Sequence, residues 1–183
     1  MKKISILLLA VCAAVFAQAA SIDWSVGATK SNKIYGPDGS TIFGKTTGDA
    51  AYLILADYAD GIKDALAAGT FSAGTEGVVG QAGGFNSYGG VTTSTATSSL
   101  MAANTDYAFS VLFVNADASQ YVMTTPATKT TSDADTVREG SFSYSDIKSA
   151  GWQTSGGGDV PEPTSGLLLL VGGAMLALRR KQK

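Results

Sequence analysis

Two uncharged apolar segments, one near each end of the 183-residue chain, limit which residues can fold together as a domain. The first covers residues 4–16. It follows a basic start and precedes Ala17-Gln18-Ala19, the small-x-small pattern of a signal peptidase site. We therefore expect residues 1–20 to form a signal peptide that engages the export machinery and is cleaved after Ala19 or Ala20. An uncleaved anchor and a lipid-acceptor site at Cys12 are the alternatives.

The second apolar segment, residues 166–178, is followed at once by a basic tip. A helix rises about 1.5 Å per residue, so this run would span roughly 20 Å of a hydrocarbon core about 30 Å thick. It predicts a short transmembrane helix that thins the bilayer or recruits residues before it. The predicted anchor consists of Gly166, Leu167, Leu168, Leu169, Leu170, Val171, Leu176 and Leu178. A buried helix of a soluble core is the alternative.

The basic tip contains Arg179, Arg180 and Lys181, and such clusters stay on the cytoplasmic side of a membrane. Everything before the tip is therefore expected to face outward. Pro161, Glu162 and Pro163 precede the apolar run. The prolines favour extended neighbours and keep the helix from starting earlier.

This order of motif, apolar run and basic tip, over residues 160–183, resembles the PEP-CTERM sorting signal of Gram-negative bacteria. The resemblance implies recognition by an exosortase-type membrane enzyme that removes the tail near the motif. In that family Glu162 and its two prolines would be recognition elements. The resemblance also implies an exported protein that is held briefly in the inner membrane and then found at the cell surface or outside the cell. It covers about an eighth of the chain.

Without its two ends the chain is acidic and lacks two reactive residue types. Residues 21–159 carry seven basic and fourteen acidic residues, a net charge of −7, whereas the whole chain has −2. This charge argues against nucleic acid as a partner. The chain has no His, and its single Cys lies in the signal peptide. Ser-His-Asp and Cys-His catalysis and the usual zinc sites are therefore excluded, and we expect no cofactor.

Short apolar or alternating runs separated by Gly, Ser and Thr predict a mostly β ectodomain over residues 21–153, a small β-sandwich or a β-rich α+β fold. A Gly-rich linker is expected at 154–159. Strands are predicted over 22–26, 51–56, 91–99, 107–114 and 121–124, with an edge strand around Phe142 and Tyr144. The strand 107–114 is apolar on both faces, which predicts a central position. One helix is expected over 60–68, capped by Asp57 or Asp60 and ended by Gly69.

Two motifs have a structural alternative to their functional interpretation. Residues 39–46 match the phosphate-loop pattern, but a turn precedes them and no room remains for the helix that must follow. We therefore expect a hairpin with Lys45 exposed. Oxygen ligands for Ca²⁺ occur at Asn115, Asp117 and Ser119, and again at residues 133 and 135. Both stretches lack the Gly and Glu of an EF-hand loop, and turns use the same residues for local hydrogen bonds.

Three functions stay open for the ectodomain. We expect an exported, non-enzymatic structural protein of the cell surface or extracellular matrix. The alternative is a carbohydrate-binding module for exopolysaccharide, in which Phe85, Tyr88 and Trp152 stack on sugar rings instead of packing over the ends of the core. A further alternative is a glycan hydrolase with Glu76 and Glu139 as its carboxylate pair.

Overall fold

The computed structural model describes residues 19–132, 139–142 and 151–156. The predicted signal peptide up to residue 18, the Pro-Glu-Pro motif, the anchor, the basic stop, Tyr144 and the acidic residues 133 and 135 lie outside the described residues. Within the described part, no helix is both long and apolar enough to cross a membrane.

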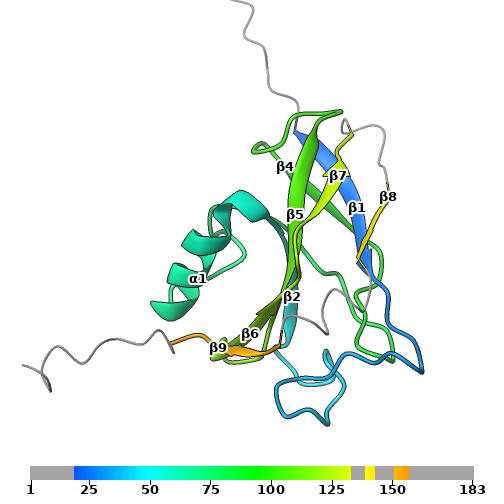
Figure 1. Cartoon of the computed structure of the whole chain (residues 1–183), viewed down its shortest axis with the longest axis vertical. Helices are drawn as coiled ribbons and strands as arrows, with labels where there is room; N and C mark the ends of the chain where they lie inside the picture. The colour runs from blue at the N-terminus through cyan, green and yellow to red at the C-terminus, as the bar shows by residue number, and fades with distance from the viewer. Residues whose placement is uncertain (1–18, 133–138, 143–150, 157–183) are drawn as a thin grey trace, which may run out of the picture.

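The described chain is mostly β, as predicted, and forms two sheets with one short helix. The smaller sheet has the order β4-β1-β8, made of β4 (Ser94–Ser98), β1 (Ala20–Val26) and β8 (Glu139–Phe142). The larger sheet has the order β3-β2-β5-β6-β9, with β7 also paired to β5. Its strands are β2 (Ala50–Leu55), β3 (Val78–Gln81), β5 (Asp106–Val114), β6 (Gln120–Met123), β7 (Ala127–Thr130) and β9 (Gln153–Thr154). The helix α1 (Ala59–Ala67) lies against the outer face of the larger sheet, which gives three layers (Figure 1).

The central position predicted for the strand at 107–114 is confirmed by β5. This strand pairs with β2 on one side and with both β6 and β7 on the other. Phe109, Val111 and Phe113 are buried in the core between the two sheets. Leu112 and Val114 are buried on the opposite face, under α1. Burial of one such side chain contributes about 1.5–3 kcal/mol. Because its two faces are buried in different cores, β5 stabilises both of them.

The predicted helix is confirmed to within one residue at each end, but the predicted caps at its start are wrong. The N-cap of α1 is Tyr58, which makes no side-chain hydrogen bond to the helix. A 3₁₀ helix, Ala56–Tyr58, runs directly into α1 and therefore contains Asp57. Asp60 lies in the first turn of α1, where its charge faces the positive end of the helix dipole. The C-cap is Ala68, so Gly69 follows the helix as predicted.

Three strands, β3, β7 and the two-residue β9, escape the sequence prediction, and one predicted strand has an unexpected partner. β3 lies in the glycine-rich stretch 74–90, where no period is visible. β7 begins directly after Pro126, the residue predicted to stop β6. β8 is an edge strand as expected for Phe142, but it pairs with β1 in parallel. The strand predicted over 91–99 is shorter and spans β4 only.

Two close contacts hold the sheets together. Ser21 in β1 exchanges two backbone hydrogen bonds with Ser132, of 3.1 and 2.9 Å, just after β7. At the other side, a Cβ atom on Gly80 would lie only 2.5 Å from the Cβ of Ala96. Trp24 fills the core near this point and is fully buried. The two sheets are therefore joined by backbone hydrogen bonds on one side and by close packing of β3 against β4 on the other.

The folded part continues beyond residue 153, where the sequence places the end of the domain. Thr154 belongs to β9, which pairs with β6. The Ser155 N–H donates to the Ser119 carbonyl at 2.8 Å, and the Ser155 hydroxyl donates to the Ala118 carbonyl. The first two residues assigned to the linker, Thr154 and Ser155, are therefore held by the sheet.

Candidate functional site

The segment that matches the phosphate-loop pattern is a turn, as predicted. The Gly36 N–H donates to the Thr41 carbonyl at 2.8 Å, and Tyr35 forms a bridge with Ile42. No helix follows Lys45, whose side chain is exposed. Gly44 has a φ of 78°, and a Cβ there would meet the Phe85 ring at 2.4 Å. Packing therefore accounts for this glycine without a phosphate.

A shallow groove of about 490 Å³ lies beside this turn. Three of its lining residues are acidic: Asp38, Asp49 and Asp117. The Asp38 carboxylate accepts four hydrogen bonds from Ser40 and Thr41. The Thr41 hydroxyl, the Thr41 N–H and the Ser40 N–H, in that order, hold the Asp38 pKa far below its usual range. Asp49 accepts a bond from the Gly44 N–H at 3.0 Å.

The calcium interpretation of Asn115, Asp117 and Ser119 is not supported by their geometry. The Ser119 hydroxyl and N–H donate to Asp117, which lowers the pKa of that carboxyl. The side-chain oxygen of Asn115, Oδ1, accepts from the Gln120 N–H at 2.9 Å, and its side-chain amide, Nδ2, donates to the Ser119 hydroxyl at 3.1 Å. These groups close a turn between β5 and β6. Among the described residues, no group of three acidic side chains is arranged to hold a metal ion.

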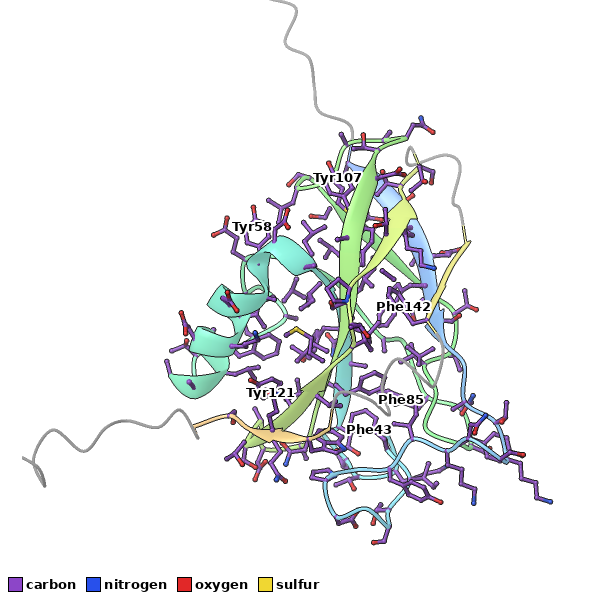
Figure 2. The ribbon with its side chains drawn as sticks, viewed as in Figure 1. Phe43, Tyr58, Phe85, Tyr107, Tyr121 and Phe142 are labelled. Atoms are coloured by element: carbon purple, nitrogen blue, oxygen red, sulfur yellow. The ribbon has the colours of Figure 1, made fainter. Side chains whose placement is uncertain are left out.

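Two of the three aromatic residues predicted to contact sugar are brought together around a buried ring. Phe85 and Trp152 lie 5.2 and 5.7 Å from Phe43, measured between ring centroids, and Figure 2 shows Phe43 and Phe85 side by side. The Trp152 Nε1–H donates to the Tyr35 carbonyl at 3.1 Å. Tyr88 is half-buried against the same core. Packing over the core end therefore accounts for these rings.

The two glutamates of the hydrolase alternative lie in segments that are associated with different sheets. Glu76 is exposed in the turn before β3, in the larger sheet. The backbone of Glu139 starts β8 in the smaller sheet and pairs with Asp23 of β1. Retaining and inverting glycosidases need their carboxyl groups within about 5–9.5 Å of each other across one bond. The topology offers no shared element that would align them.

A second groove, which the sequence did not predict, lies between α1 and the strands β6 and β9. One part has a volume of about 360 Å³ and the next about 390 Å³. Both parts are lined by Lys63, Tyr121 and Gln153, so they are continuous. Tyr121 belongs to β6, and Figure 2 shows it on the side of this strand that faces α1. We call this feature the α1–β6 groove.

Ser110 is one of the residues that line the first part of the α1–β6 groove. It is only 1% exposed, and its hydroxyl has no hydrogen-bond partner within the described residues. The sequence carries one signal of this feature, because Ser110 interrupts the apolar run of β5. Polar side chains in such a run normally have a partner, so an unpaired one marks a place to examine.

Comparison with known proteins leaves this chain without an assigned family. No protein-family model matches it, and it has no significant similarity to a curated protein or to a solved structure. Its function must therefore be argued from its own residues.

Proposed function

We propose that this chain is an exported, non-enzymatic structural protein of the cell surface or extracellular matrix, sorted through its C-terminal signal. The observation that carries the proposal is the placement of the folded part between two processing signals. β1 starts at Ala20, directly after the Ala17-Gln18-Ala19 pattern. Among the described residues the last strand is β9, followed by the contacts of Ser155, and Pro161-Glu162-Pro163 comes after them in the sequence.

Each end of the chain then has one task. The signal peptide takes the chain to the export machinery, and signal peptidase removes it. The apolar run up to Leu178 holds the exported chain in the inner membrane, while Arg179 and Arg180 stop it from passing through. An exosortase-type enzyme recognises Glu162 between its prolines and releases the domain to the surface.

The domain between these signals offers support for a structural role. It has no imidazole or thiol, and its clustered aspartates accept hydrogen bonds that close their own turns. Thr41 and Ser119 donate hydrogen bonds to the carboxylates of Asp38 and Asp117. A catalytic pair needs carboxylates that are free to exchange protons.

Exopolysaccharide binding is the second candidate function. The residues first considered for it, Phe85 and Trp152, are engaged with Phe43, which weakens that version. The α1–β6 groove offers a different place for it, because the polar side chains of Lys63 and Gln153 line both of its parts.

The sorting proposal is tested by fractionating cells of a bacterium that has an exosortase-type enzyme. Glu162→Ala should leave the unprocessed chain in the inner membrane fraction, because the recognition element is gone. Deletion of residues 179–183 should also abolish surface display, because the basic stop is lost. Glu76→Ala removes an exposed glutamate of the domain and serves as the control that should behave as wild type. Identical distribution of all four proteins would overturn the proposal.

A further inference from the structure

The turn at Asp38 contains a chemically labile sequence. The chain has two Asp-Gly sequences, Asp38-Gly39 and Asp60-Gly61. In such a sequence the glycine nitrogen can attack the carboxyl carbon of the aspartate, because glycine has no side chain that hinders the approach. The nitrogen gives up its proton and the carboxyl its hydroxyl group, so one water leaves and a succinimide ring closes. One water then opens the ring at either carbonyl and gives aspartate or isoaspartate.

The geometry of the turn requires the glycine of this labile sequence. The Gly39 N–H donates to the Gly36 carbonyl at 3.0 Å, which makes a β-turn with Pro37 and Asp38 at its centre. Proline at the second position and glycine at the fourth are favoured in the commonest turn of this kind. Gly39 also has a φ of 67°, in the left-handed region where other residues are strained. The fold therefore retains a glycine directly after the aspartate.

Packing does not shield the Asp38-Gly39 bond. Both residues are exposed. A Cβ atom added at Gly39 would meet no other atom within 4 Å in the described part of the chain. Protection of this bond must therefore come from hydrogen bonds within the turn.

Four hydrogen bonds hold the Asp38 carboxylate in place. It accepts from the Ser40 N–H at 3.0 Å, from the Thr41 N–H at 2.9 Å and from both hydroxyl groups of these residues. All four donors come after Gly39 in the chain, so the carboxylate must give them up before it can turn onto the Gly39 nitrogen. That nitrogen is itself held by its bond to the Gly36 carbonyl. Ring closure therefore requires the turn to open.

The same donors keep the carboxylate in its unreactive state. Ring closure needs a neutral carboxyl group, which can release its hydroxyl as water. The Thr41 hydroxyl, followed by the Thr41 and Ser40 N–H groups, favours the ionised form and holds the pKa of Asp38 far below its usual range. Geometry and charge thus oppose the reaction together.

Asp60-Gly61 provides a reference within the same chain. It lies in the first turn of α1, and ring closure would require Asp60 to leave its helical backbone dihedrals. The Asp60 carboxylate accepts a bond of 2.9 Å from the Lys63 ammonium. Neither of these restraints involves Ser40 or Thr41.

We propose that the hydrogen bonds from Ser40 and Thr41 protect the Asp38-Gly39 sequence from isomerisation to isoaspartate. Thr41 has the larger part, because both its hydroxyl and its N–H bond the carboxylate. The turn then combines a glycine that its backbone needs with two donors that suppress the reaction this glycine allows. This inference is independent of the export route and of any ligand.

The test incubates the purified full chain at neutral pH over weeks and follows isoaspartate after digestion with trypsin. Cleavage after lysine places Asp38 in the peptide 34–45 and Asp60 in the peptide 46–63. Liquid chromatography with mass spectrometry separates the aspartyl and isoaspartyl forms of each. Thr41→Val should raise the rate at Asp38 by about tenfold, the effect of one hydrogen bond to a charged group, and leave the rate at Asp60 unchanged.

Thr47→Val, at an exposed position nearby, is the control and should keep the wild-type rate at both aspartates. Wild type unfolded in urea should isomerise at Asp38 at least about tenfold faster than folded wild type. Equal rates at Asp38 in wild type and Thr41→Val would overturn the proposal, as would equal rates in the folded and unfolded chain. A similar acceleration at Asp38 and Asp60 would show that Thr41→Val only loosens the whole domain, which also contradicts a specific role for Thr41.

Discussion

The Thr124 hydroxyl accepts a hydrogen bond from the Val111 N–H at 2.8 Å, and the Thr124 N–H donates to the Val111 carbonyl at 3.0 Å. This reciprocal pair lies in the larger sheet, in the short segment between the end of β6 and the start of β7. It satisfies the backbone N–H and carbonyl of Val111, the residue after Ser110. Val111 lies between the β5 residues that pair with β7 and those that pair with β6. A single threonine, which also lines the α1–β6 groove, therefore pairs with Val111 where β6 ends.

Replacement of Thr124 by valine keeps the shape and removes the acceptor. Val111 is fully buried, so its N–H would lose its partner without access to water. We expect the free energy of unfolding in urea to fall by about 1–3 kcal/mol. Thr128→Val, at an exposed position of β7, should change it by no more than about 0.5 kcal/mol. Equal losses in the two variants would contradict a specific role for the Thr124 hydroxyl.

Gly80→Ala should also destabilise the domain, through a clash between the sheets. The added Cβ would lie 2.5 Å from the Ala96 Cβ and 3.4 Å from Trp24 Nε1, so the strands would have to move apart. Overpacking of this kind costs about 1–3 kcal/mol, measurable by urea unfolding.

Gly61→Ala is the matched control for Gly80→Ala. Gly61 lies in α1, is exposed, and has nothing within 4 Å of its added Cβ. Alanine favours a helix over glycine, so this variant should gain about 0.5–1 kcal/mol. Opposite signs for the two changes are the expected result, and a loss in both would contradict it.

The Asp38 turn should make stability fall in acid. The hydrogen bonds from Thr41 and Ser40 hold the pKa of Asp38 below the ordinary value of about 3.9. Such a group contributes stability above its ordinary pKa and loses it as the pH falls through the lowered value. The advantage of wild type over Asp38→Asn should thus be full above about pH 5 and shrink below about pH 4.

Urea unfolding at pH 7 and at pH 3 checks the acid dependence of the Asp38 turn. Thr41→Val removes the largest cause of the lowered pKa and should shift the dependence in the same direction as Asp38→Asn. Thr47→Val, at an exposed position nearby, should keep the wild-type dependence. A constant difference between wild type and Asp38→Asn across this range would contradict the role of the turn.

The sequence predicts best those strands in which each face meets the same environment along the whole strand. β5 is apolar on both faces because it has a core on each side, and that pattern is visible without a structure. β3 is not visible, because Gly80 must be small for the sheets to meet and so breaks the alternation. β7 was not predicted because its residues are polar and it follows Pro126 directly. It pairs with only half of β5.

The candidate sites were less predictable than the strands, because their function depends on contacts between distant segments. The spacing of Gly39 and Gly44 in a phosphate-loop pattern does not reveal that Phe85 packs against the second glycine. Asn115 and Asp117 look like metal ligands until their hydrogen bonds within the turn are known. The Ser110 hydroxyl lacks a hydrogen-bond partner among the described residues. This depends on the break in pairing between β6 and β7, which no local pattern shows.

Under the proposed export route, the start of β1 favours cleavage after Ala19 over cleavage after Ala20. Ala20 is fully buried and pairs with Ser98, so its removal would shorten the strand at a core position. Cleavage after Ala19 keeps it. The intact mass of the exported protein should therefore correspond to a chain that begins at Ala20. A mature chain that begins at Ser21 would contradict this prediction.

Phe43 should be among the most sensitive positions of the domain. It is fully buried, and its ring contacts Phe85 and Phe113 edge-on at 5.2 and 5.1 Å and Trp152 at 5.7 Å. These rings come from a loop, from β5 and from the segment before β9, so one side chain joins three distant parts of the chain. Phe43→Ala should lower the free energy of unfolding by about 3–5 kcal/mol.

Phe43→Leu separates the ring contacts from simple burial. It keeps most of the apolar volume and loses the edge-to-face contacts, each worth about 0.5–1.5 kcal/mol, so its loss should be smaller than that of Phe43→Ala. Tyr35→Ala, at a side chain that is 37% exposed, provides the control and should have little effect in the same urea titration. A small loss for Phe43→Ala would mean that the rings of Phe85 and Trp152 do not depend on Phe43, and the sugar-stacking interpretation of those two residues would then regain its support.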